Sequence, residues 1–314
     1  MKRFVWAVAA LGVTAICLWL LLTPDVIAAL RRVVHEAQPL PILAAFVLVA
    51  LVQWLRAWRF SVMTAGTLAL PGLTLIRIAL QLNCLNFVLP FRAGELSYPV
   101  LMRRHFGHGL LHSAGVLLLA RLFDLATVTC LFFAAAAWLG LVGGAGGTLL
   151  VLAALGAGVA PLAILLLGQA LRPWIARLPR VGNAATKLTA GLESIADRRT
   201  GLAAVALGFD IWLGLALAAI LVADAVTTGV PAAAAILGAS AGHVAFALPV
   251  NGIAGVGPSQ GAWVAATTKA GVPWDDAVIS ALALHAVVLT NALLLGALAT
   301  VPELGRRMSA SSDR

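Results

Sequence analysis

The sequence predicts an all-α integral membrane protein, a polytopic helical bundle of about six full transmembrane helices and two re-entrant helical hairpins. Of its 314 residues, 62% are hydrophobic and only 11% are charged, and the mean hydropathy is +1.02. A soluble domain has about 45–50% apolar and about 25% charged residues. The long Ala/Leu/Val runs lack the short alternating strands of an outer-membrane barrel, so we expect helices to cross the membrane.

The basic residues are interpreted as loop residues of a membrane protein. The formal net charge is +9, but most lysines and arginines flank apolar segments, which is typical of cytoplasmic loops and not of a nucleic-acid-binding surface. This basic rim should attract anionic lipid headgroups. Cys17, Cys84 and Cys130 lie singly in apolar segments and predict neither a disulfide framework nor a metal site.

The first 64 residues predict two spans joined by a short loop. Residues 4–22 follow Lys2 and Arg3 without a cleavage site, so we interpret them as a retained signal anchor that begins in the cytoplasm. Residues 23–39 are expected to form a short polar extracytoplasmic loop. Residues 40–64 form the second span, whose end carries an aromatic and basic cluster typical of the cytoplasmic interface: Trp54, Arg56, Trp58 and Arg59.

Residues 73–89 are short for a span and contain Arg77. They predict either a tilted full helix or the first limb of a re-entrant hairpin that returns over residues 95–102. Arg103 and Arg104 favour the hairpin, because they bring the chain back to the cytoplasmic side.

The later segments follow the same pattern and leave both termini in the cytoplasm. The predicted segments are spans at 112–139 and 148–171, a cytoplasmic amphipathic linker at 172–199, a span at 201–223, a second hairpin formed by 231–249 and 259–269, and a last span at 276–301.

The two interrupted segments echo each other, since Phe87-Val88-Leu89-Pro90 is matched by Phe246-Ala247-Leu248-Pro249. The distribution of Lys and Arg places their entry points on opposite sides of the membrane. We therefore predict a single integral membrane domain built as an inverted repeat, with halves at about 40–171 and 200–302. Interrupted backbone in lipid must line a protein cavity, so the two tips predict a transport site.

The first tip contains Arg92, Gly94 and Glu95. Gly94 permits a tight turn, the helix that restarts after it would point its amides into the cavity, and Arg92 offers a planar fork suited to phosphate. These residues predict a lipid-headgroup clamp with Glu95 as counter-ion or proton carrier. The alternative is an Arg–Glu pair that neutralises itself at an interface.

The second tip contains Asn251, Gly252, Gly255 and Gly257, and Pro258-Ser259 then starts a helix. This pattern is similar to an anion-cradling loop and predicts headgroup contact. The alternative is that the glycines only allow helices to approach closely.

Other ionisable residues lie inside apolar segments. Arg121 and Asp124 share a helix face and predict a polar lining, either as a structural ion pair or as part of a transport path. For Asp210, His243 and His285, we expect hydrogen bonds inside the bundle, with proton relay as the alternative. Three histidines, His105, His108 and His112, lie on one helical face. No carboxylate or cysteine accompanies them, so they predict no metal site.

Several of these stretches resemble the lysylphosphatidylglycerol synthase transmembrane-region family. They are Arg56-Ala57-Trp58-Arg59, the stretch from Asn83 through Phe87-Val88-Leu89-Pro90-Phe91-Arg92-Ala93-Gly94-Glu95, Arg121-Leu122-Phe123-Asp124 and the glycine-rich stretch 248–257. The resemblance covers nearly the whole chain and implies a flippase-like protein of the bacterial inner membrane that moves phospholipids or lipid-linked glycans between leaflets. The chain departs from the family at Gln260, where many members have an acidic residue. We also expect no aminoacylation, because the soluble aminoacyltransferase domain of synthesising relatives does not follow.

The sequence therefore predicts a transporter, not an enzyme, that moves an anionic phospholipid or lipid-linked headgroup across the inner membrane without a cofactor, a metal or a nucleic-acid partner. One alternative is an intramembrane enzyme acting on polyprenyl-phosphate lipids. Another is a membrane partner subunit of a separate synthase. Nothing in the sequence indicates an oligomeric state.

Overall fold

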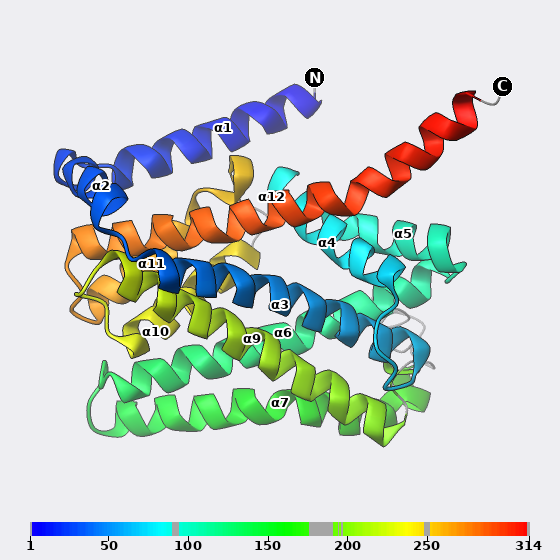
Figure 1. Ribbon diagram of the computed structural model, residues 1–314. Helices are drawn as coiled ribbons and strands as arrows, with labels where there is room; N and C mark the ends of the chain where they lie inside the picture. Colours follow the sequence, from blue (N-terminus) through cyan, green and yellow to red (C-terminus); the bar gives the residue numbers. More distant parts are fainter. Residues whose placement is uncertain are drawn as a thin grey trace.

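The helices of the computed structural model follow the predicted order closely (Figure 1). The structure describes residues 2–89, 94–175, 191–193, 195, 197–247 and 252–312, and these contain no strand. The helical elements are α1 (Lys2–Leu21), α2 (Pro24–Glu36), α3 (Pro39–Ala65), α4 (Leu73–Val88), α5 (Ser97–Phe106), α6 (Leu110–Trp138), α7 (Ala145–Ile175), α9 (Arg198–Val226), α10 (Ala232–Ala247), the 3₁₀ turn η2 (Ile253–Gly255), α11 (Pro258–Lys269) and α12 (Trp274–Ser312).

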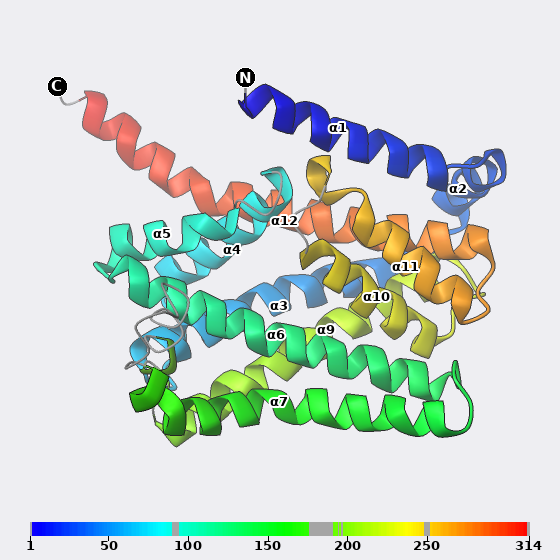
Figure 2. The same cartoon turned by 180° about the vertical axis from the view of Figure 1, so that it is seen from behind.

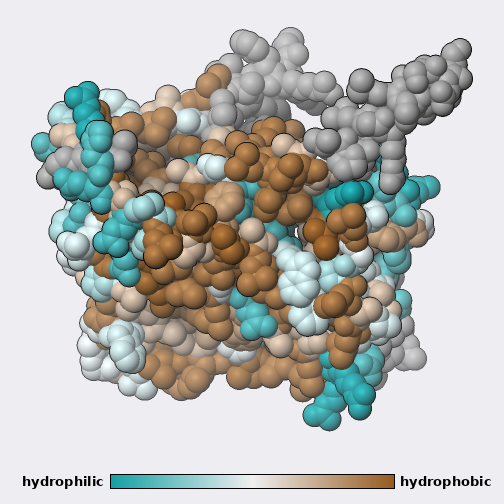
Figure 3. All heavy atoms as spheres, viewed as in Figure 1, coloured by the Kyte–Doolittle hydropathy of each residue, from teal (hydrophilic) through white to brown (hydrophobic). Residues whose placement is uncertain are grey.

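Among the described residues, five helices are long and apolar enough to cross a membrane, namely α3, α6, α7, α9 and α12. A sixth candidate is the pair Thr14–Leu21 and Pro24–Arg31, which is bent by 82° between α1 and α2. Figure 3 shows a broad hydrophobic surface over α3 and α9, with hydrophilic side chains gathered toward the two ends of these helices. The chain is therefore an all-α polytopic membrane protein, as predicted.

The two short apolar helices, α4 and α10, each have 16 residues. At 1.5 Å per residue each extends about 24 Å, less than the roughly 30 Å of a bilayer core. Figures 1 and 2 show α4 and α5 entering and leaving at one end of the bundle, and α10 and α11 at the opposite end. We call these the α5 end and the α11 end. This arrangement favours the predicted re-entrant hairpins over a tilted full helix at 73–89, and the re-entrant insertion stays a prediction.

Corresponding helices of the two predicted halves make corresponding contacts. The helices α3 and α9 pack along each other, α4 packs against α12, and α10 packs against α6. This pattern supports the predicted inverted repeat, which stays a prediction. Much of the predicted linker 172–199 lies outside the described residues.

Local signals define the ends of the elements around the hairpins. Gly66 and Gly107 end α3 and α5 in the left-handed conformation, with φ of 63° and 72°, which glycine adopts at little cost. The carboxylate of Asp197 accepts hydrogen bonds from the backbone amides of Arg199 and Thr200 and so starts α9. These caps fix where α3 and α5 end and where α9 begins.

The predicted loop at 23–39 is wrong, because most of it forms α2. The hydroxyl of Thr23 accepts a hydrogen bond from the Val26 amide at 3.3 Å, and Pro24 follows as the first helical residue. A capping threonine, a first-turn proline and the acidic Asp25 are together a helix-start signal. The segment was expected to be a loop because its composition is polar, which an amphipathic helix also allows.

Candidate functional site

The tips of the two hairpins meet inside the bundle. The ring of Phe87, in the last turn of α4, lies 5.3 Å from the ring of Phe246 in the last turn of α10. Between them, Gly255 has a φ of 76°, and a Cβ there would come within 2.9 Å of Phe246 and 3.1 Å of Phe87. Only glycine fits this contact, so η2 can close directly against α4.

A cavity of about 800 Å³ lies beside this contact. Both hairpins line it, together with α3, α6, α9 and α12, and many of its lining side chains are apolar. Its polar lining residues are Gln53, Arg56, Asn83, Asn86, Glu95, Arg121, Asp124, His243, Ser259, Gln260 and His285. The cavity therefore combines a polar region with apolar walls.

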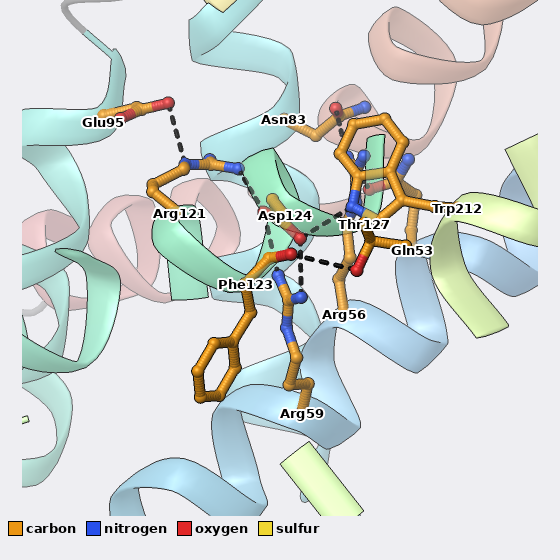
Figure 4. A network of polar contacts seen from close by, with 10 residues as sticks. All are labelled: Gln53, Arg56, Arg59, Asn83, Glu95, Arg121, Phe123, Asp124, Thr127 and Trp212. Atoms are coloured by element: carbon orange, nitrogen blue, oxygen red, sulfur yellow. Dashed lines mark hydrogen bonds and ion pairs between the residues drawn. The ribbon is translucent and has the colours of Figure 1, made fainter. Parts of the chain in front are cut away.

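Asp124 is the shared acceptor of the polar network in Figure 4. Its Oδ1 accepts from Arg59 Nη1 at 2.6 Å and from Trp212 Nε1 at 2.8 Å. Its Oδ2 accepts from Arg59 Nη2 at 3.1 Å and from Arg121 Nη1 at 3.0 Å. Four donors from three helices saturate this carboxylate, so its charge is fully compensated in an apolar surrounding.

The network continues toward the first hairpin tip. Glu95 Oε1 lies 3.1 Å from Arg121 Nε. On the other side, Arg56 Nη1 approaches Gln53 Oε1 and Asn83 Oδ1, each at 3.4 Å. Three guanidinium groups (of Arg56, Arg59 and Arg121) thus accompany two carboxylates, so the described network carries one positive charge in excess.

The structure brings three predicted site residues to the cavity: Glu95, Arg121 and Asp124. Gly94 shapes the first tip instead of lining the cavity, and its carbonyl oxygen accepts a hydrogen bond from the Ser97 hydroxyl at 2.5 Å. The headgroup-binding role of these residues stays a prediction. Arg92 lies outside the described residues.

At the second tip the predicted glycines build the turn. The Gly252 amide donates to the Val256 carbonyl, the Gly255 amide to the Gly252 carbonyl, and the Gly257 amide to Gln260 Oε1, at 3.0, 3.2 and 2.7 Å. Their contact with a headgroup stays a prediction, and side chains that follow, such as Gln260, are the groups of this tip that line the cavity. Asn251 lies outside the described residues.

Sequence reasoning misplaced two charged residues. Arg59 was interpreted as part of a cytoplasmic interface, but it is 2% exposed and pairs with Asp124 inside the bundle. The one available signal was its place in the family-like stretch Arg56-Ala57-Trp58-Arg59. Asp210, expected to be hydrogen-bonded inside, is exposed on the outer side of α9.

The remaining candidates are histidines. His243 Nδ1 lies 2.6 Å from the Ala239 carbonyl oxygen, which is the internal hydrogen bond expected for it. His285 lines the cavity with its ring 6.1 Å from that of Phe87. The rings of His108 and His112 stack at 5.8 Å, and no group of three or more potential metal ligands occurs in the described part of the chain. Trp212 and Gln53 are site residues that the sequence did not indicate, and Asn83 was indicated only as the first residue of a family-like stretch.

Comparison with known proteins gives one match. Residues 7–296 match the family described as "Lysylphosphatidylglycerol synthase TM region". No curated protein and no solved structure matches the chain significantly. Since the match spans most of the chain, the protein belongs to the lysylphosphatidylglycerol synthase transmembrane-region family of membrane proteins linked to lipid modification or transport.

Proposed function

We propose that the chain moves an anionic phospholipid or lipid-linked headgroup between the leaflets of the bacterial inner membrane, with both termini in the cytoplasm. The cavity between the two hairpin tips is the observation that supports this function best. It contacts elements that enter from both ends of the bundle. A headgroup held there is reached from either side when one hairpin or the other moves.

The charge of the cavity favours an anionic headgroup. Arg56 and Arg121 line the cavity beside Glu95 and Asp124, and Arg59, buried behind the cavity, already compensates Asp124. A guanidinium in an apolar surrounding binds phosphate through directed hydrogen bonds. Arg92, close to Gly94 in the sequence, would add a further cation to this tip.

The walls of the cavity favour a lipid over a soluble anion. Leu96, Leu125 and Val244 line the cavity and are also 76%, 51% and 38% exposed on the described surface. Because these side chains come from different elements, the apolar wall is continuous with the surface that faces the acyl chains of the bilayer. The headgroup would enter the cavity while its tails stay in the membrane. No catalytic step, metal or cofactor is part of this proposal.

Scrambling of a fluorescent phosphatidylglycerol in proteoliposomes tests the proposal, with dithionite quenching as the readout. We expect the wild-type chain to accelerate leaflet exchange over protein-free vesicles. Arg92→Ala or Glu95→Ala should lower the rate at least about tenfold, because a charge-assisted hydrogen bond contributes about 1.5–3 kcal/mol.

Lys269→Ala and Asp224→Ala are the matched controls. Both remove an exposed charge near the α11 end, and both should scramble like the wild type. Thermal unfolding in detergent verifies that every variant is folded. An Arg92→Ala/Glu95→Ala double variant that is folded and scrambles at the wild-type rate would contradict the proposed function.

A further inference from the structure

The outer side of α9 carries a carboxylate in the middle of the span. Asp210 is the thirteenth of the 29 residues of this helix, and its side chain is exposed. On the same face, Leu202, Leu213 and Leu217 are 43%, 51% and 48% exposed. Figure 3 shows a hydrophilic spot over α9 within the hydrophobic surface. A lipid-facing leucine stripe is thus interrupted by one acidic side chain.

This position is unfavourable for a carboxylate in contact with lipid alone. Ionisable side chains within transmembrane helices face the bundle interior or pair with another group. Within the described part of the chain, no hydrogen bond or ion pair holds Asp210. The described arginines that lie away from the ends of the spanning helices are Arg56, Arg59 and Arg121, and all three belong to the inner network.

We propose that α9 docks a transmembrane helix of another protein, and that a lysine or arginine in the middle of that helix pairs with Asp210. The leucines on either side of Asp210 supply the apolar contact, and the pair removes an uncompensated charge from lipid. A second copy of this chain is the less suitable occupant, because α9 against α9 would bring two Asp210 carboxylates together. The proposal does not depend on lipid transport.

The test uses the full chain, with its three native cysteines replaced, in phosphatidylcholine liposomes with a donor fluorophore at Thr228→Cys, near the end of α9. The probe is an acceptor-labelled polyleucine peptide of about 20 residues with one central lysine, and its control is the same peptide with leucine at that position. Energy transfer measures association. We expect the lysine peptide to bind the wild type about tenfold more tightly than the leucine peptide.

The variants locate the contact. Asp210→Leu should lose the preference for lysine, and Asp224→Leu, an exposed carboxylate at the end of the same helix, should keep it. Since Asp210→Leu only extends an exposed leucine stripe, it should unfold no more readily than the wild type. Equal binding of the two peptides to the wild type would overturn the proposal. Energy transfer between two differently labelled copies of the chain that is lost in Asp210→Leu would also overturn it, since it would assign the face to self-association.

Discussion

The carboxylate of Asp124 compensates the positive charges of two arginines inside the bundle, Arg59 and Arg121. Arg59 is 2% exposed and contacts Asp124 through both terminal nitrogens. Without the carboxylate, its guanidinium would remain buried beside the apolar cluster that includes Phe60 and Phe123. The stability of the bundle therefore depends on this residue more than on any exposed charge.

Asp124→Asn should destabilise the protein by about 3–5 kcal/mol, because it leaves a buried guanidinium without its counter-ion. The measurement is denaturant or thermal unfolding in detergent, with Asp224→Asn at the exposed end of α9 as the control. Replacing both partners in an Arg59→Met/Asp124→Leu variant should recover part of the loss, since the pair is then removed as a unit. Equal stability of Asp124→Asn and the wild type would contradict the assigned role.

The contacts of Asp124 within its own helix could be predicted from the sequence, and its contacts with other helices could not. Arg121 and Asp124 are three apart on one helix, so their contact is a matter of helical geometry. The contact between Arg59 and Asp124 spans 65 positions and that between Trp212 and Asp124 spans 88. Such pairs depend on how α3, α6 and α9 pack, and local spacing does not contain that information.

At the element scale, the hairpins were predictable because their signals are local. Short apolar runs ended by proline and glycine predicted α4 and α10 to within a few residues. The helix α2 was missed, because a short amphipathic helix and a polar loop have similar composition. In the sequence, only the charges favour a hairpin over a tilted span at 73–89, and in the structure the helix lengths and the course of the chain favour it too.

The first hairpin depends on Gly94. A Cβ at this position would come 2.5 Å from the backbone carbonyl carbon of Leu85 and 2.6 Å from the backbone nitrogen of Asn86. The tip therefore packs directly on the backbone of α4, and a methyl group would meet backbone atoms that cannot move aside as a side chain can.

Gly94→Ala should destabilise the protein by about 1–3 kcal/mol, the typical cost of overpacking, and should slow lipid scrambling by opening the hairpin. Gly72→Ala is the matched control at the start of α4, where a Cβ would meet no atom within 4 Å. Unfolding curves of the two variants give the comparison. If both variants unfold at the same midpoint as the wild type, the close packing of the tip is not needed for the hairpin.

At the scale of the whole molecule, the sequence predicted opposite entry of the two hairpins from charge asymmetry alone. The contact of Phe87 with Phe246, and the cavity beside it, could not be predicted in this way. They arise because α4 packs on α12 while α10 packs on α6, and this matched arrangement brings both tips to the same depth. Charge patterns fix the side of the membrane at which a segment begins, and packing fixes the place where it ends.

The opposite orientation of the hairpins is testable with single cysteines in a variant whose three native cysteines are replaced. Thr67→Cys lies before α4 and Arg104→Cys lies near the end of α5, so the two bracket the first hairpin. Thr228→Cys and Lys269→Cys bracket the second hairpin in the same way. A membrane-impermeant maleimide is applied to right-side-out and to inverted vesicles.

Each bracketing pair should react from one side only, and the two pairs should react from opposite sides. The cytoplasmic side is expected for the first pair, because Arg103 and Arg104 lie beside it. The cysteine-free parent, which should stay unlabelled, controls for reaction of the maleimide with groups other than thiols. Labelling of positions 67 and 104 from opposite sides would mean that α4 and α5 together span the membrane. Both hairpins would then no longer be inverted copies of one unit, and a cavity reached from both leaflets would lose its structural basis.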